Sequence, residues 1–240
     1  VFYLLCVITS MIKKSIFKKK SFLNYRYMKC RISKKKSKVF LDLGKMPLAN
    51  GFLNRGKIKK EFFYPLKVAF TKELSLVQLA ENPPPKKMFN KSYPFYTSSS
   101  KYMKNHFNVF AQFVKKNYLK KDSLIIELGS NDGTFLSNFN KKNSFGFEPS
   151  KSVHDVAIKN GVQSINKFFN LKNTALFKKN YNNFDLIVGS NVFCHIPDQI
   201  ELLKTIDKLL SKEGTIILEE PYLGSMYKKI SYDQIYDEHI

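Results

Sequence analysis

The stretch Leu124-Ile-Ile-Glu-Leu-Gly-Ser-Asn-Asp-Gly-Thr-Phe-Leu136 decides the fold of this 240-residue chain. Apolar positions lead into Glu127 and Gly129, which is typical of a buried strand, and a polar loop follows. Gly133 then opens an apolar segment that we expect to begin a helix. A strand, a glycine turn and a helix start form the ligand-binding corner of a doubly wound α/β sheet. Gly129 would let a ligand lie against bare backbone, and the next helix would offer unpaired N–H groups.

Acidic side chains around this corner indicate the charge of the ligand. The spacing from Gly129 to Gly133 is not the G-x-G-x-x-G of a nicotinamide site. Glu127 and Asp132 would repel a pyrophosphate but suit a cation. Glu148 ends the predicted second strand, at the position where a carboxylate takes two ribose hydroxyls. S-adenosylmethionine (SAM), with its sulfonium and ammonium groups, fits this arrangement. The plain alternative is a structural β-turn-α unit with solvated acids.

The composition is globular but strongly basic. Hydrophobic residues make up 43% of the chain, and 41 Lys and Arg against 19 Asp and Glu give a net charge of +22. Residues 1–60 contain one acid, Asp42. Such a field favours nucleic acid, acidic lipid or a nucleotide-linked substrate. The lysines run through the whole chain, however, and Arg is scarce, so we expect solvated lysines and no specific nucleic-acid partner.

The spacing of the cysteines indicates the redox compartment, and the N-terminal segment indicates whether the chain spans a membrane. Cys6, Cys30 and Cys194 are far apart in the sequence, which implies no disulfide framework and predicts a reducing cytoplasm. The apolar run 1–12 is shorter than the roughly 20 residues that a membrane-spanning helix needs. We therefore expect no membrane span. Residues 1–28 are expected to be a disordered tail or sequence upstream of the true start.

A small β-rich module is predicted over residues 29–85. Val39–Leu43 alternates as a strand, Gly44–Asn50 reads as a turn-rich loop, and two further short strands fall within 66–79. The run of prolines after Asn82 then breaks regular structure and predicts a linker.

Residues 86–240 are predicted to form the larger domain. An aromatic and hydroxyl-rich stretch precedes a helix over Lys101–Asn117. This stretch is either a capped surface loop or a lid whose Tyr93 and Tyr96 close over the cofactor or substrate. Alternation of strands and helices from 124 to 220 predicts a parallel sheet of order 3-2-1-4-5 with right-handed crossovers.

Several polar and aromatic residues fall at the carboxyl ends of the predicted strands, where such sheets bind ligands. Asn191 and His195 follow the fourth strand. Phe168 follows the third strand and either flanks an adenine or belongs to the core. The predicted cofactor-binding residues are Glu127, Gly129, Asn131, Asp132, Glu148, Phe168 and Asn191.

Over residues 29–240 the chain resembles the sugar C-methyltransferases of deoxysugar biosynthesis. The motifs that carry this resemblance are Leu41-Asp-Leu-Gly44, Pro47-Leu-Ala-Asn50, Leu76-Val-Gln-Leu79, Tyr93-Pro-Phe-Tyr96, Glu127-Leu-Gly-Ser-Asn-Asp-Gly-Thr134, Phe147-Glu-Pro-Ser150, Asn191-Val-Phe-Cys-His-Ile-Pro-Asp198 and Ile235-Tyr-Asp-Glu-His239. The resemblance implies a Rossmann-like class I methyltransferase sheet, an N-terminal zinc module and a further C-terminal domain.

The resemblance also implies a reaction and its residues. The substrate would be a nucleotide-linked 4-keto-deoxysugar that is methylated through an enolate at the carbon beside the ketone. His239 would remove the proton, with Tyr236 and Glu238 placing it or the sugar. His195 would hydrogen-bond the developing enolate oxygen.

The chain departs from the family pattern in three places. Of the four zinc-ligand positions only Cys30 is a cysteine, because Ser33, Thr71 and Leu74 occupy the others. One thiolate cannot hold a tetrahedral zinc, so we expect no bound metal. The family's Tyr-His-Glu-His reads Tyr-Asp-Glu-His over 236–239, and the sequence stops at Ile240. Two alternatives stay open: a SAM-dependent RNA or DNA methyltransferase, and a truncated SAM-binding remnant without catalysis.

Overall fold

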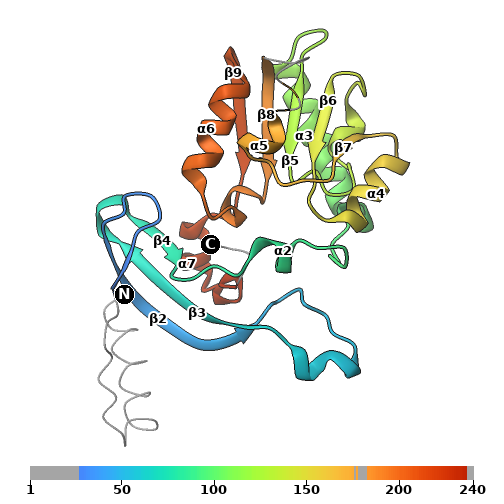
Figure 1. Ribbon diagram of the computed structural model, residues 1–240. Coiled ribbons are helices and arrows are strands. Elements are labelled where there is room, and N and C mark those ends of the chain that lie inside the picture. The colour runs from blue at the N-terminus through green and yellow to red at the C-terminus, as the bar shows by residue number, and fades with distance from the viewer. Residues whose placement is uncertain (1–26, 176, 178–182, 237–240) are drawn as a thin grey trace, which may run out of the picture.

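The computed structural model describes residues 27–175, 177 and 183–236, which build two sheets (Figure 1). The first is a four-stranded antiparallel sheet of order β1-β2-β3-β4. Its strands are β1 Tyr27–Lys29, β2 Lys36–Pro47, β3 Phe63–Thr71 and β4 Leu76–Leu79. Alternate residues of β3, Tyr64, Leu66 and Val68, form the buried core of this module together with Leu79. Ile235, near the other end of the chain, packs against the same core.

The predicted loop at Gly44 is instead part of a long strand. β2 continues to Pro47, and its pairing with β3 shifts register between Asp42 and Lys45. Gly44 has a φ of +78°, and its N–H donates to the Asp42 carboxylate at 3.0 Å. This glycine therefore bends the strand at a bulge rather than ending it. β1 also begins at Tyr27, two residues before the predicted start of the module at 29.

The second sheet is parallel throughout and has the order β7-β6-β5-β8-β9. In chain order this is 3-2-1-4-5, which confirms the predicted topology. Its strands are β5 Ile125–Leu128, β6 Ser144–Phe147, β7 Gln163–Ile165, β8 Phe184–Ser190 and β9 Leu210–Glu219. The helices are α2 Pro85–Met88, α3 Lys101–Tyr118, α4 Lys151–Lys159, α5 Leu171–Thr174, α6 Gln199–Leu209 and α7 Leu223–Lys229.

Helices cover both faces of this sheet (Figure 1). On one face α3 and α4 pack over Ile125, Leu186 and Val188, and on the other α6 packs over Ile126 and Ile187. Successive strand residues point to opposite faces, so strands buried on both sides need the continuous apolar runs seen in the sequence. Within the described ranges, no helix combines the length and apolarity that a membrane span requires.

The segment after Gly133 does not form the expected helix. It is a turn followed by a 3-10 helix, Leu136–Asn138. The Ser137 hydroxyl donates to the Thr134 carbonyl at 2.8 Å, and the Asn138 amide donates to the same carbonyl at 3.1 Å. Short polar side chains that take local carbonyls compete with an α-helix, which explains the difference.

Candidate functional site

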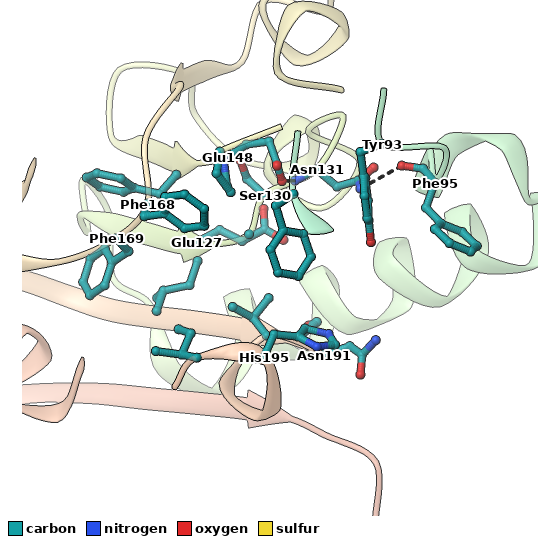
Figure 2. Close-up of a pocket in the computed structure, with 18 of the residues that line it drawn as sticks. Tyr93, Phe95, Glu127, Ser130, Asn131, Glu148, Phe168, Phe169, Asn191 and His195 are labelled. Atoms are coloured by element: carbon teal, nitrogen blue, oxygen red, sulfur yellow. Dashed lines mark hydrogen bonds between the residues drawn. The ribbon is translucent and has the colours of Figure 1, made fainter. Parts of the chain in front are cut away.

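A cavity of about 870 Å³ lies at the carboxyl ends of the parallel strands. Glu127 in β5, Glu148 after β6, Asn191 after β8 and Glu219 in β9 all line it. Figure 2 shows Glu148 and Asn131 on one side, Asn191 and His195 opposite, the pair Phe168 and Phe169 at one end, and Tyr93 and Phe95 at the other. The cavity therefore occupies the ligand-binding position of a doubly wound sheet.

Most of the predicted site residues meet at this cavity. Its lining includes Glu127, Gly129, Asn131, Glu148, Phe168, Asn191, Tyr93, Tyr96, His195 and Tyr236. Asp132 is not part of the lining. Glu238 and His239 lie outside the described residues, so their predicted roles stay predictions.

Glu127 is a buried acid with an unused hydrogen-bond acceptor. Its side chain is 4% exposed. Burial raises its pKa well above the usual 4.5, and the charges of Glu148 and Asp132 raise it further. Among the described residues, five buried side-chain atoms have no hydrogen-bond partner, and three of them belong to residues that line the cavity: Glu127 Oε2, Ser130 Oγ and Ser190 Oγ. Unpaired buried polar atoms are costly, so the site is built for a polar ligand.

Glu148 is the second buried acid and is held by backbone groups. Its Oε1 accepts from the Ser150 N–H at 2.6 Å, and its Oε2 accepts from the Asn131 N–H at 3.0 Å. Burial raises its pKa in spite of these bonds, and the Asp132 charge adds to the rise. The Glu148 carboxylate also lines the cavity, where a ligand hydroxyl could donate to it.

Gly129 is required by the protein itself as well as by any ligand. Its φ is +61°, in the left-handed region that favours glycine. A Cβ added there would lie 2.5 Å from Val192 Cγ2 in the loop after β8. The glycine thus allows that loop to approach β5 closely.

Asn131 and Asp132 fasten the aromatic loop that precedes α3. Asn131 Oδ1 accepts from the Thr97 N–H and its Nδ2 donates to the Phe95 carbonyl, both at 3.0 Å (Figure 2). Asp132 Oδ2 accepts from the Ser98 N–H at 2.8 Å. The other Asp132 oxygen accepts from the Thr134 hydroxyl at 2.6 Å.

Asp132 is fully buried, and its oxygens accept from the loop before α3 and from Thr134. The direct cofactor contact of Asp132 stays a prediction. The same bonds hold Tyr93 and Tyr96 against the cavity. Ser100 also caps α3, its hydroxyl accepting from the Met103 N–H at 3.3 Å, so the loop has features of both interpretations and the lid stays a prediction.

The loop after β8 presents the remaining polar groups. His195 lies in the 3-10 helix Phe193–His195 and is 7% exposed. Its ring meets the ring of Phe89 edge-on, with 5.7 Å between centroids. Sequence reasoning missed Phe89 and also Glu219, whose carboxylate binds His106 Nε2 at 2.9 Å. The position of Glu219 at the carboxyl end of the fifth strand was the available signal.

The zinc positions of the small module do not fit a metal. Cys30 is buried, and burial acts to raise the pKa of its thiol. Hydrogen bonds with Thr71 and Ser33 outweigh burial and bring the pKa from 9.0 to about 7. Leu74, at the fourth position, is 45% exposed and has no ligand atom. In the part of the chain that the structure describes, no three His, Cys, Asp or Glu side chains form a metal-binding group.

Comparison with known proteins gives two family matches. Residues 30–89 match a family described as "Putative zinc binding domain", and residues 102–240 match the family described as "Methyltransferase domain". C-methyltransferase NovU of Streptomyces niveus is 27% identical over 203 residues, which are 83% of this chain and 48% of NovU. The chain thus spans about half the length of this curated relative.

Two solved structures are similar at low identity. The plantazolicin methyltransferase BpumL, in complex with a pentazolic analogue and SAH, has a TM-score of 0.46 and 20% identity, covering 59% of each chain. A SAM-dependent methyltransferase from Thermotoga maritima has a TM-score of 0.42 and 23% identity, covering 58% of this chain and 66% of its own. The methyltransferase match spans more than half of the present chain and contains the whole parallel sheet. The chain therefore belongs to the family of SAM-dependent methyltransferases.

Proposed function

We propose that this protein binds SAM in the cavity and transfers its methyl group to a carbon of a nucleotide-linked 4-keto-deoxysugar, beside the ketone. The resemblance of the motifs to sugar C-methyltransferases and the similarity to NovU support this substrate class. The reaction would be a step of deoxysugar biosynthesis.

One observation supports the proposal most directly: two buried acids face a cavity of SAM-compatible size. Glu127 offers an unpaired oxygen, and the Glu148 carboxylate lines the cavity while two backbone N–H groups hold it in place. A cationic ligand near these carboxylates would restore the charged forms that burial disfavours. Glu148 would receive the ribose hydroxyls, Glu127 would lie near the ammonium group, and Phe168 would lie against the adenine.

The residues of this chain would then perform three tasks. SAM supplies a methyl group activated for attack by a carbanion. His239 would accept the proton from the carbon beside the ketone, since a neutral histidine has a suitable pKa. His195 would donate a hydrogen bond to the enolate oxygen that develops. Tyr236, Tyr93 and Tyr96 would hold the sugar, because alignment of the carbon with the methyl group is the main contribution of the enzyme.

Calorimetry tests the cofactor site. The protein should bind SAM and its demethylated product, and Glu148→Gln should weaken binding about tenfold by removing one acceptor from the ribose contact. Asp207→Asn, an exposed acid on α6, is the matched control. Equal affinity in the wild-type protein and Glu148→Gln would reject the ribose assignment.

Isotope exchange tests the chemistry. In heavy water, the protein should exchange the hydrogen beside the ketone of a 4-keto sugar nucleotide. His239→Ala should abolish this exchange, whereas His195→Ala should slow it by about 100-fold, as the loss of one oxyanion donor does elsewhere. Exchange that persists in His239→Ala would remove that residue as the base.

A further inference from the structure

Four consecutive backbone N–H groups of the loop after β8 are bound by Glu219, the last residue of β9, and by Glu220, which follows it. The Asn191 N–H donates to the Glu219 carbonyl at 2.6 Å. The N–H groups of the next three residues all donate to the carboxylate of Glu220. The distances are 3.0 Å from Val192 and 2.6 Å from Phe193 to Oε1, and 3.3 Å from Cys194 to Oε2.

The carboxylate replaces a helix cap that the loop itself lacks. Val192 is the N-cap of the 3-10 helix Phe193–His195 and makes no side-chain capping bond, because valine has no polar group. The first N–H groups of a helical turn need acceptors from outside the turn. Glu220 supplies them from the neighbouring strand, and bonds to an ionised acceptor are stronger than bonds between neutral groups.

Residues 192–194, the segment held by Glu220, are flanked on each side by a residue that lines the cavity. Asn191, with a φ of +55°, precedes it, and His195 follows it, with its own N–H donating to the Val192 carbonyl at 2.9 Å. Every backbone N–H from 191 to 195 therefore has an acceptor. The position of the His195 ring depends on this backbone, and a displacement of about 1 Å at a reacting group can cost about 100-fold in rate.

We propose that Glu220 is a positioning residue, which holds the loop that presents Asn191 to the cofactor and His195 to the substrate. It acts through the backbone and does not itself touch the reacting atoms. This role rests on the proposed methyl transfer, in which His195 binds the enolate oxygen. In Glu220→Gln, the side-chain oxygen should still accept from the N–H groups of Val192 and Phe193. The side-chain NH2 group would face the N–H of Cys194, and two donors form no hydrogen bond.

The test compares Glu220→Gln and Glu220→Ala with Glu213→Gln, an exposed acid of β9. Two readouts are measured: hydrogen exchange of the segment 191–196, and steady-state kinetics with SAM and the 4-keto sugar nucleotide. We expect exchange of this segment to become at least tenfold faster in both Glu220 variants. We expect kcat to fall about 10-fold in Glu220→Gln and about 100-fold in Glu220→Ala, with KM for the sugar nucleotide unchanged. Glu213→Gln should match the wild-type protein.

Several results would overturn the role. Unchanged exchange in Glu220→Ala would show that the carboxylate does not hold the loop. Faster exchange with wild-type kcat would show that holding the loop does not position the chemistry. A Glu220→Gln protein that fails to fold would assign the residue to stability instead. If the wild-type protein transfers no methyl group, the proposed function fails, and the exchange experiment still decides whether Glu220 holds the loop.

Discussion

Glu127 is buried beside two other acids, so its carboxyl group keeps its proton to a higher pH in the folded protein than in the unfolded chain. Between the ordinary pKa of 4.5 and the raised value, the native state binds more protons than the unfolded state. The free energy of unfolding of the ligand-free protein should therefore fall as pH rises through this range. Glu127→Gln should flatten this dependence in thermal denaturation at a series of pH values, with Asp207→Asn as the control.

The affinity for SAM should change with pH in the opposite direction to the free energy of unfolding, because SAM binds the ionised carboxylate of Glu127. This affinity should rise with pH over the same range in the wild-type protein and stay level in Glu127→Gln. Parallel stability curves for the wild-type protein and Glu127→Gln would contradict the shifted pKa.

Gly129 gives a prediction about strain at a single position. Gly129→Ala should lower the free energy of unfolding by about 2–4 kcal/mol, from the left-handed backbone and the contact with Val192. Val192→Ala in the same protein should restore the part that comes from the contact and leave the backbone part. Chemical denaturation of the two single variants and the double variant measures both parts. Additive losses in the double variant would show that the two residues do not meet.

At the scale of elements, the aromatic loop depends on Asn131 for its position. Asn131→Ala removes the bonds to Thr97 and Phe95, and hydrogen exchange over 93–98 should become at least tenfold faster. KM for the sugar substrate should rise, because Tyr93 and Tyr96 lose their fixed place at the cavity. Asn105→Ala, an exposed residue of α3, is the control. Wild-type exchange in Asn131→Ala would mean that other contacts hold the loop.

The strands of the parallel sheet could be predicted because their signals are local. Short apolar runs ending at Leu128 and at Phe147 mark strands that are buried on both faces of the sheet. The segment after Gly133 could not be predicted in this way. Its outcome depends on whether the Ser137 and Asn138 side chains bind nearby carbonyls, which apolar periodicity does not report.

The candidate site was predictable where residues follow a strand directly, as Glu148, Asn191 and His195 do. Glu220 also follows a strand, but its partners are backbone groups of another loop, and no sequence pattern records such a pairing. Asp132 shows the opposite case. Its place in the motif suggested a ligand contact, and the motif did not indicate that its oxygens also accept from the loop before α3 and from Thr134.

For the whole molecule, the small module should be stable without metal, since hydrogen bonds take the place of ligands. Arg31 donates from its backbone N–H and its Nε to Gln78 Oε1, while Gln78 Nε2 donates to Ser37 Oγ, which in turn bonds Thr71. A chelator should leave Tm unchanged. Gln78→Ala should cost about 2–3 kcal/mol, because several buried groups lose partners.

Thermal denaturation with and without chelator measures the first effect, and chemical denaturation measures the second. Gln112→Ala on the exposed face of α3 is the matched control. A fall in Tm on chelation, together with zinc in the purified protein, would contradict the metal-free module.

Asn131 belongs to two contacts at once: its backbone N–H binds Glu148, and its side chain binds the loop that carries the tyrosines. Binding of the SAM ribose at Glu148 therefore affects Asn131, the same residue that holds the loop on the sugar-binding side of the cavity. We expect this shared residue to couple the two sites, so that bound methyl donor strengthens the binding of the sugar. Thermodynamic reciprocity then requires that the sugar strengthen the binding of the donor by the same factor.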